Sequence, residues 1–279
     1  MSVQWFPGHM SKAIRQIKEK IKVIDCLIEI VDARAPLASR NPELTSINKP
    51  RLIIMSKIDL ADPSVSKKWY SYFKSNNVEV LEMDLVNNFS YKLVLDKCEI
   101  LLREKLAKDK EKGLRKRPIR AMVIGIPNVG KSTFINKMSK RKATGVGNIP
   151  GFTKGQQWVR SGDIELLDTP GVLWHKFEDE QTGIKLALVG TVKETILNKD
   201  KLSDIALNFL ISNYPKELTK RYNLNNLDNV FYDIAINRGL LISGGEPSID
   251  NAKELLLHEL KNGIIGRISL EKPGEQDGN

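Results

Sequence analysis

The sequence predicts an α/β domain, with a mostly parallel sheet covered by helices on both faces, followed by a small all-helical domain. Apolar runs of strand length alternate with helical patterns through the first 176 residues, an order typical of parallel strands joined by helices. Beyond about residue 177 only helical patterns follow. We therefore expect one domain over residues 1–176 and a second over residues 177–279.

The expected elements follow from the spacing of apolar residues. Residues 9–22 read as a basic amphipathic helix, because apolar residues recur there at helical spacing between lysines and arginines. We expect strands over residues 23–31, 51–55, 78–83, 119–124, 157–160 and 164–167, with helices over residues 64–74, 91–110 and 131–140. The second domain is expected to hold helices near residues 182–189, 203–213, 227–238 and 248–261, punctuated by Pro215 and Gly244-Gly245.

Charge is distributed unevenly between the two expected domains. The net charge is +10, yet residues 177–279 hold 12 Lys and Arg residues against 16 Asp and Glu residues. The densest basic run, Arg103 to Arg120, contains nine basic and three acidic residues. Together with Lys12–Lys22 and Lys137–Lys142 it favours a nucleic acid as partner, since neutralising phosphates supplies affinity independent of base sequence. The alternative is a solvated surface that keeps the protein soluble.

Composition excludes several classes of protein. No apolar run approaches the roughly 18 residues of a membrane span, and the N-terminus lacks the pattern of a signal peptide. Cys26 and Cys98 lie in apolar stretches and form neither a metal-binding nor a disulfide pattern. We expect both thiols to be reduced and the protein to act in the cytoplasm, with no membrane partner.

Residues 125–132 form a phosphate-binding motif. The run Gly-Ile-Pro-Asn-Val-Gly-Lys-Ser matches G-x-x-x-x-G-K-[ST], follows an expected strand and opens an expected helix. Glycines let backbone N–H groups close around phosphate oxygens, and the helix N-terminus favours negative charge. We expect Lys131 to reach the β- and γ-phosphates and the Ser132 hydroxyl to ligate Mg²⁺. The residues expected to contact the nucleotide here are Asn128, Val129, Gly130, Lys131, Ser132 and Thr133.

Two further segments complete a phosphate-sensing site. Asp168-Thr169-Pro170-Gly171 ends the next strand but one, where Asp168 can hold Mg²⁺ through water and the N–H of Gly171 can contact the γ-phosphate. Between the two motifs, a loop rich in Gly and Pro contains Thr153, which can cap Mg²⁺ when the γ-phosphate is present. Thr144 is the competing candidate for that role.

The base is expected to be read by Ser56-Lys57-Ile58-Asp59, again at a strand end. A carboxylate at Asp59 accepts two hydrogen bonds from guanine, whereas adenine offers no such pair and would leave a buried acceptor unpaired. The aliphatic stem of Lys57 can lie over the base plane. Loops of this kind usually begin with Asn, so we expect Ser56 to weaken a loop-to-loop tether and the affinity more than the specificity.

The order of these motifs is unusual. A Ras-like chain runs from the phosphate loop through the switch Thr and Asp-x-x-Gly to the guanine reader, but here Asp59 precedes Lys131 by 72 residues. The elements are present in rotated order, which predicts a circularly permuted Ras-like P-loop GTPase domain. The basic segment from Lys108 to Pro118 would then join the original ends.

At this point the chain resembles the RbgA/YlqF family of circularly permuted GTPases. The resemblance rests on the opening Trp5-Phe6-Pro7-Gly8-His9-Met10, the run Asp32-Ala33-Arg34-Ala35-Pro36, the two phosphate motifs and Pro150-Gly151-Phe152-Thr153. It implies a bacterial cytoplasmic GTPase that acts late in assembly of the large (50S) ribosomal subunit. It also favours Thr153 over Thr144 as the switch residue. Residues 83–86 match the family's second guanine-side loop poorly. Assigning them to that loop implies that Asp84 and Leu85 lie near the base.

The resemblance also bears on hydrolysis. Where Ras-like enzymes carry a water-orienting Gln, this chain has Val172 and Leu173, neither of which can orient water. The family's substitute is His9, since an imidazole can polarise water near neutral pH. The alternatives are a helix-cap or RNA-contacting role for His9, and His175 as a minor catalytic candidate. Asn128 is expected to hold K⁺ beside the phosphates, or alternatively to stabilise its own turn.

These expectations combine into a working hypothesis. The partners are the precursor of the large subunit, its rRNA and ribosomal proteins, and the protein is expected to be a monomer. Within the acidic helical domain, Lys216, Lys220 and Arg221 form a candidate RNA patch or a solvated surface. The rival functions are a GTPase associated with tRNA or another RNA, and a nonenzymatic RNA-binding assembly factor. Intact Lys131, Ser132 and Asp168 speak against the latter.

Overall fold

A single six-stranded sheet forms the centre of the computed structural model, which describes residues 7–139, 158–174, 179–192 and 198–274. The strand order is β3-β2-β1-β4-β6-β5, and every neighbouring pair is parallel except β5 with β6. All six strands predicted from the sequence are present. They are β1 (Cys26–Asp32), β2 (Arg51–Ser56), β3 (Glu79–Met83), β4 (Ile119–Ile124), β5 (Trp158–Ser161) and β6 (Ile164–Asp168).

The strand order fits a rotated chain. From β4 the chain reaches the edge strand β5 and returns through β6 beside β4, while β1, β2 and β3 move outward on the other side. The direction reverses between β4 and β1, and ligands of open α/β sheets bind at the carboxyl ends of the strands beside such a point. The phosphate-binding motif of residues 125–132, here called the glycine loop, follows β4 at this place.

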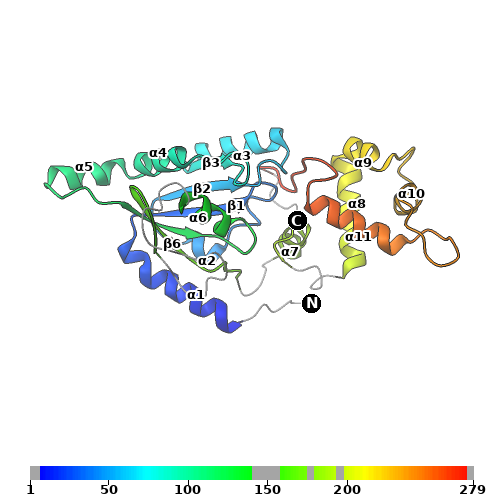
Figure 1. Ribbon diagram of the computed structural model, residues 1–279, viewed down its shortest axis with the longest axis horizontal. Helices are drawn as coiled ribbons and strands as arrows, with labels where there is room; N and C mark the ends of the chain where they lie inside the picture. Colours follow the sequence, from blue (N-terminus) through cyan, green and yellow to red (C-terminus); the bar gives the residue numbers. More distant parts are fainter. Residues whose placement is uncertain (1–6, 140–157, 175–178, 193–197, 275–279) are drawn as a thin grey trace.

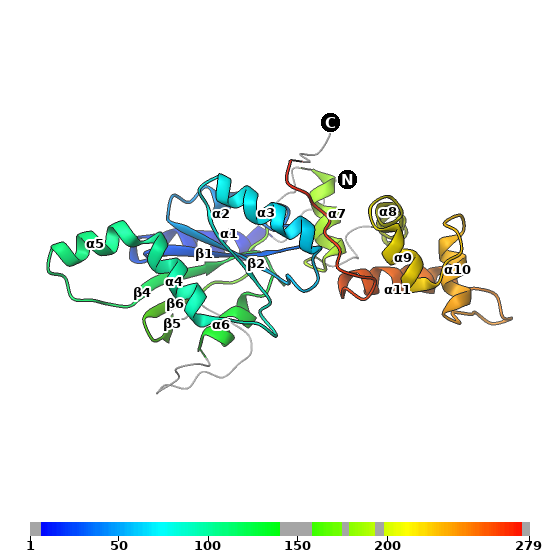
Figure 2. The same ribbon diagram turned by 90° about the horizontal axis from the view of Figure 1, so that it is seen from above.

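Helices cover both faces of the sheet, as predicted. On one face, apolar residues of α1 (Pro7–Lys20) and α3 (Pro63–Ser75) are buried against strand residues such as Leu27 and Val31. On the other face, α4 (Tyr91–Leu101) and α6 (Lys131–Ser139) pack against Ile28 and Ile30. Alternate residues of β1 thus enter opposite cores, and Figure 2 shows the two helical layers. Cys26 and Cys98 are free thiols buried in the second core.

Three helical predictions need correction. The helix expected over residues 91–110 is two helices, α4 and α5 (Arg103–Glu111), with a break at Leu102. Pro215 does not merely punctuate: it opens α9 (Pro215–Tyr222), since a proline in the first turn removes only an N–H group that has no partner inside the helix. The short helix α2 (Pro42–Thr45) was not predicted.

The helix α5 is an exposed arm at the amino end of the sheet. It has no buried residue, and the segment 112–117 that follows it is exposed throughout. At its base, the carboxylate of Asp25 receives hydrogen bonds from Lys105 and from Arg117, the latter at 2.7 and 2.8 Å. Figure 1 shows α5 projecting at the opposite end of the molecule from the helical domain.

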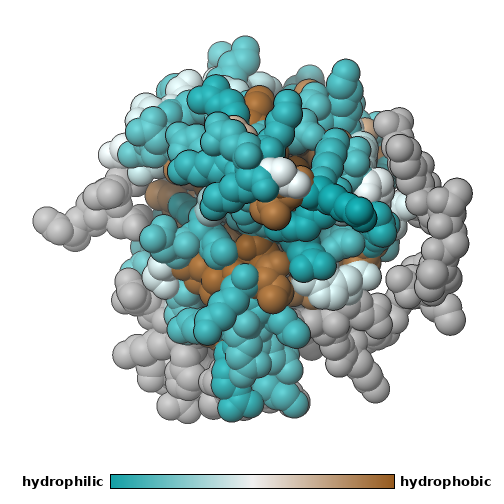
Figure 3. Space-filling view, turned by 90° about the vertical axis from the view of Figure 1, so that its left-hand side faces the viewer, coloured by the Kyte–Doolittle hydropathy of each residue, from teal (hydrophilic) through white to brown (hydrophobic). Residues whose placement is uncertain are grey.

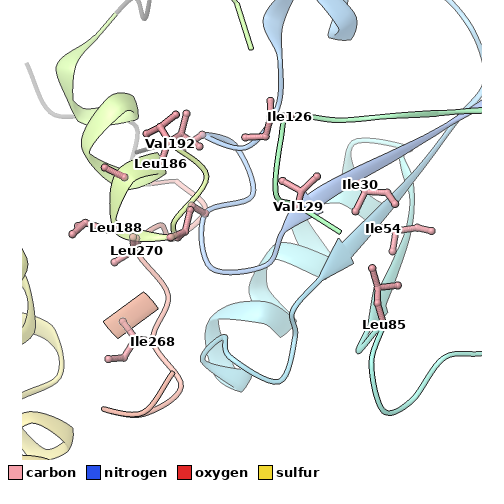
Figure 4. Close-up of a cluster of buried hydrophobic side chains, with 14 of the residues drawn as sticks. Ile30, Ile54, Leu85, Ile126, Val129, Leu186, Leu188, Val192, Ile268 and Leu270 are labelled. Atoms are coloured by element: carbon pink, nitrogen blue, oxygen red, sulfur yellow. The ribbon is translucent and has the colours of Figure 1, made fainter. Parts of the chain in front are cut away.

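The remaining helices form a bundle that returns to the sheet. After α7 (Glu180–Leu188) come α8 (Lys199–Asn213), α9, α10 (Val230–Asn237) and α11 (Ile249–Lys261). Residues 263–271, here called the C-terminal segment, then run back to α3, where the indole N–H of Trp69 donates to the carbonyl of Glu271 at 3.0 Å. Figure 4 shows apolar side chains of α7, the C-terminal segment and the glycine loop in one cluster.

None of the helices within the described ranges is long and apolar enough to cross a bilayer.

Candidate nucleotide site

The predicted motifs converge at the carboxyl end of the sheet. Because β1, β2, β3, β4 and β6 are parallel, the loops that follow them share one edge. A Cβ atom placed on Gly130 would lie 2.9 Å from Cδ1 of Leu85 and 4.0 Å from Cβ of Ser56, which brings three of these loops together. A Cβ atom placed on Gly171 would lie 2.8 Å from the backbone nitrogen of Pro127. These close approaches bring residues 44 to 74 positions apart in the sequence into one site.

The glycine loop has the backbone that phosphate binding needs. Its φ angles are +150° at Gly125, +60° at Asn128 and +104° at Gly130, and α6 begins at the next residue. Glycine is required at position 125, because a Cβ atom there would lie 2.6 Å from the carbonyl oxygen of Ile30. The N-terminus of α6 therefore faces the loop with its N–H groups, as at other phosphate sites.

The side chain of Lys131 is a buried cation that an anion would stabilise. Its side chain is buried, and Nζ donates to the carbonyl of Ile126 at 2.7 Å. Burial lowers the pKa of Lys131 to about 8, against the opposing charge of Asp168. A Cβ atom on Gly171 would lie 2.8 Å from Nζ, so only glycine leaves space beside the ammonium group. A polyphosphate bound here would supply negative charge that compensates the buried ammonium group for its lost hydration.

The candidate magnesium ligands lie at the same edge. Ser132 is exposed in the first turn of α6, and half-buried Asp168 ends β6, paired in register with Val123 of β4. The next residue, Thr169, fixes this strand end because its hydroxyl donates to the carbonyl of Val123 at 2.6 Å. Thr133 is exposed beside Ser132. Thr153, Thr144 and His175 lie outside the described residues, and the side chain of His9 does so as well, although its backbone belongs to α1.

Ser56 supplies the tether that we expected it to weaken. Its side chain is fully buried, and its hydroxyl lies 2.6 Å from the carbonyl oxygen of Val129 and 2.8 Å from that of Val31. The hydroxyl thus joins residues 56–59, the expected guanine-reading segment and here called the guanine loop, to the glycine loop and to the end of β1. A loop-to-loop tether is therefore present with Ser at this position, because its short side chain lies between the two carbonyl groups.

In the turn that carries Asp59, the Asp59 side chain is exposed, whereas neighbouring residues contact Asp32 and the C-terminal segment. Asp59 is exposed at the carboxyl end of β2. Lys57 before it has φ of +54°, and its Nζ lies 2.9 Å from a carboxylate oxygen of Asp32. Arg267 of the C-terminal segment donates to the carbonyl groups of Ile58 and Ala61, at 2.6 and 2.8 Å. The sequence analysis missed Arg267, and no local pattern indicates it.

The second guanine-side loop is occupied by its own contacts. The carboxylate of Asp84 accepts hydrogen bonds from the backbone of Val86 and from the backbone and side chain of Asn87. Burial tends to raise the pKa of Asp84, but these bonds outweigh it and the pKa lies below its usual value. Leu85 is buried and packs on the glycine loop. Asp84 therefore holds its own turn, and Leu85 supports Gly130.

Asn128 and Val172 make hydrogen bonds to segments far from them in the sequence. The amide nitrogen of Asn128 donates to the carbonyl groups of Gly190 and Thr191, at 3.3 and 3.4 Å, in the turn after α7. Val172 and Leu173, which stand in place of the water-orienting Gln, are buried. The carbonyl of Val172 accepts a hydrogen bond from Asn41 at 2.9 Å. Their side chains therefore pack in the core, as apolar residues do.

Comparison with known proteins decides the family. The profile described as "50S ribosome-binding GTPase" matches residues 120–237. Ribosome biogenesis GTPase A of Bacillus cereus is 45% identical over 282 residues, covering 99% of this chain and 95% of that protein. This chain belongs to the ribosome biogenesis GTPase A family. Its Thermotoga maritima member is 34% identical over 97% of this chain and 95% of that protein.

Solved structures confirm the fold. YlqF from Thermotoga maritima has been determined bound to GNP and to GDP, and each structure is 29% identical to this chain. The TM-scores are 0.65 and 0.69, over 94% and 93% of this chain and 99% of each solved chain. The predicted fold, a circularly permuted P-loop GTPase domain, is therefore confirmed. As a member of the ribosome biogenesis GTPase A family, the chain binds and hydrolyses GTP.

Proposed function

We propose that this GTPase times a late step in assembly of the large (50S) ribosomal subunit by binding rRNA of the immature particle. The observation that carries the proposal is the exposed arm formed by α5 and residues 112–117. Residues 103–117 contain eight basic and three acidic residues. A nine-residue helix without a buried face gains little from packing, so its stability and role depend on what its charges meet.

The position of the arm separates RNA attachment from nucleotide chemistry. It emerges at the amino end of the sheet, whereas the GTP loops lie at the carboxyl end. Hydrophilic side chains cover most of this end of the molecule (Figure 3). In the helical domain, by contrast, Arg221 is committed to Glu259 by an ion pair, which leaves Lys216 and Lys220 as the exposed bases of the expected patch. The arm is thus the stronger candidate for long-range attraction to rRNA.

Hydrolysis would use the loops at the carboxyl end. Ser132, Thr153 and Asp168 would hold Mg²⁺, a proposal supported at two of these positions by a hydroxyl in the first turn of α6 and a half-buried carboxylate on the adjoining strand. Mg²⁺ would neutralise charge on the β- and γ-phosphates. Lys131 would hold the same phosphates from the buried side, where its ammonium lies against the glycine loop.

Two further groups would act on the γ-phosphate. His9 would orient the attacking water, since Val172 and Leu173 are buried. Asn128 would hold K⁺ through its carbonyl oxygen, because its amide nitrogen is already directed at Gly190 and Thr191. Replacing His9 by Ala should spare GTP binding and abolish turnover stimulated by large-subunit particles. Replacing K⁺ by Na⁺ should slow that turnover, and equal rates in the two salts would argue against the cation site.

We place this activity in the cytoplasm, with the protein acting as a monomer on the particle and touching ribosomal proteins as well as rRNA. Residues 1–176 would supply the GTPase domain and most of the electrostatic attraction, and residues 177–279 would supply a helical domain that contacts the particle by shape. Loss of the γ-phosphate would release Thr153 and Gly171 and change the position of the helical domain.

The arm provides the test. A Lys108→Gln, Lys110→Gln, Lys112→Gln variant should bind immature large subunits more weakly, and the slope of log affinity against log salt should fall by about two. The matched control replaces three exposed lysines outside the basic stretches and the expected patch, Lys67, Lys68 and Lys92, by Gln. Equal weakening by both triple variants would mean that the arm is not a specific contact. GTP turnover measured with and without particles separates an assembly GTPase from a nonenzymatic RNA-binding protein.

A further inference from the structure

The run Asp32-Ala33-Arg34-Ala35-Pro36 has no role in the function described so far. Asp32 ends β1 beside the guanine loop, and the side chains of Asp32 and Arg34 are buried, with 0% and 4% of their surface exposed. The guanidinium of Arg34 binds the carboxylate of Asp32 in a bidentate manner, from Nε at 2.9 Å and from Nη2 at 2.8 Å. Buried charges are retained only where such pairing compensates for lost water.

The same carboxylate holds the guanine loop. Nζ of Lys57 lies 2.9 Å from Oδ2 of Asp32, so one buried anion receives two cations. Burial alone would raise the pKa of Asp32, but Arg34 and Lys57 outweigh it and keep the pKa below its usual value. With its ammonium fixed at Asp32, the aliphatic stem of Lys57 has a defined direction beside the expected base.

The other N–H groups of Arg34 reach the helical domain. Nη2 donates to the carbonyl of Val189 at 2.9 Å, and Nη1 donates to the carbonyl of Lys261 at 2.7 Å. These carbonyl groups end α7 and α11, where helices leave acceptors without an intrahelical partner and carry partial negative charge. A guanidinium can serve the carboxylate and two helix ends at once because its donors point in several fixed directions in one plane, which a lysine cannot copy.

The C-terminal segment holds the other side of the same loop. Arg267 donates to the carbonyl groups of Ile58 and Ala61, which bracket Asp59 in sequence. The N–H of Ile268 donates to the carbonyl of Leu60 at 3.0 Å. A Cβ atom on Gly263 would lie 2.8 Å from Cδ2 of Leu60, so the segment approaches the turn closely. Ile268 and Leu270 of this segment are buried, and Figure 4 shows them near the apolar residues of α7.

We propose that Arg34 and Arg267 are positioning residues for guanine recognition, through which the helical domain and the C-terminal segment set the geometry of Lys57 and Asp59. The inference rests on the proposed guanine-reading role of that loop. By thermodynamic reciprocity, guanine binding then also favours the arrangement in which Arg34 contacts the ends of α7 and α11. Neither arginine touches the base; each acts through the loop that does.

The first test measures dissociation constants of GDP, IDP and inorganic tripolyphosphate for the full chain and for Arg34→Lys and Arg267→Gln. Both variants should bind GDP about five- to tenfold more weakly and tripolyphosphate as tightly as the parent. Arg267→Gln should also reduce the preference for GDP over IDP. IDP lacks the exocyclic amine from which Asp59 is expected to accept a hydrogen bond. Unchanged GDP affinity, or an equal loss for tripolyphosphate, would overturn the proposal.

A control variant separates positioning from loss of stability. The hydroxyl of Tyr214 contacts Ser269 and Asp62 but no residue of the turn 57–61. Tyr214→Phe should lower the unfolding temperature and leave the affinity for GDP unchanged. If Tyr214→Phe weakens GDP binding as much as the arginine variants do, the arginines merely stabilise the fold and the proposal fails.

A double-mutant cycle identifies the route. Lys57→Met keeps the aliphatic stem and removes the ammonium, so Arg34→Lys should weaken GDP binding less than twofold in that background. An undiminished effect would show that Arg34 does not act through Lys57. Should the arginine variants not fold, hydrogen exchange of the unaltered chain replaces them. GDP, but not tripolyphosphate, should slow exchange of amides in residues 185–191 and 257–263, and equal protection by both ligands would overturn the inference.

The outcomes also distinguish this inference from the proposed guanine site. If Asp59→Asn and Lys57→Met both leave GDP affinity unchanged, the guanine-reading role itself is wrong. If those two variants weaken GDP binding while Arg34→Lys and Arg267→Gln do not, the guanine site stands and only the role of the arginines is refuted.

Discussion

At the carboxyl end of the sheet, buried polar contacts join the ends of β1 and β2 to the glycine loop, whereas at the amino end a helix without a buried residue projects into solvent. The first arrangement holds backbone atoms in defined positions. Ser56 and Asp32 make short polar contacts there, and the glycine positions have no room for a side chain. The second presents many equivalent charges that need no fixed geometry. A nucleotide with one required pose suits the first, and a polyanion read mainly by its charge suits the second.

The difference predicts large effects of single changes at the carboxyl end and small, additive effects at the amino end. The largest is expected at Asp59. In Asp59→Asn, the amide would present a donor where guanine also presents donors, so GTP affinity should fall by about a thousandfold. Xanthosine triphosphate, which carries a carbonyl at that position, should gain affinity. Competition binding with the two nucleotides measures the switch, and retained GTP preference would contradict the assignment.

Gly171→Ala should be next in size. The added Cβ would meet Nζ of Lys131 and the backbone of Pro127 at 2.8 Å, and the backbone cannot move aside as a flexible side chain does. A displacement of this order at reacting groups costs about a hundredfold in rate. The matched control is Gly113→Ala, at the amino end, where no atom lies within 4 Å of the added group. Single-turnover GTP hydrolysis should collapse in the first variant and be unaffected in the second.

The buried ammonium predicts a pH dependence. Since the pKa of Lys131 is about 8, the free protein loses this charge as pH rises through that value. Phosphates favour the charged form, so binding above pH 8 must take up a proton, and GDP affinity should fall by up to about tenfold per pH unit. Below pH 8 this group should contribute no slope. Lys131→Arg, which does not titrate in this range, should lack the slope; an unchanged slope would assign it to another group.

The smallest effect concerns the base of the arm. Burial tends to raise the pKa of Asp25, but hydrogen bonds from Arg117, Lys105 and the backbone of Arg120 outweigh it and hold the pKa below its usual value. This stabilisation is therefore present above the unfolded pKa and is lost as pH falls below about 4. Asp25→Asn should lower the free energy of unfolding by about 1 kcal/mol at pH 7, with partly exposed partners limiting the effect. Urea denaturation should show that difference shrinking at pH 3.

Local patterns predicted a large part of this molecule. The six strands follow from apolar runs of strand length, and the phosphate motif follows from glycines and a lysine at fixed spacing before a helix. The rotated order of Asp59 and Lys131 was sufficient to predict the permutation. Each of these signals is contained within a few neighbouring residues, or in the order of such groups along the chain.

Long-range contacts were not predictable in the same way. The break at Leu102 divides a continuous helical pattern, and Pro215 opens a helix at a position expected to punctuate the pattern. Ser56 holds its loop through carbonyl partners 25 and 73 residues away, which its neighbours in the sequence do not indicate. The contact of Arg267 with a turn more than 200 residues earlier leaves no trace in its neighbours.

The amino-acid sequence by itself determined the GTPase chemistry of this protein, because a phosphate-binding loop is set by residue types at short spacing. Tertiary structure alone decided how that chemistry is held. Arg34 can reach the ends of α7 and α11 only after some 150 to 230 intervening residues have folded, and the energy of a buried charge depends on partners that the chain delivers from far away.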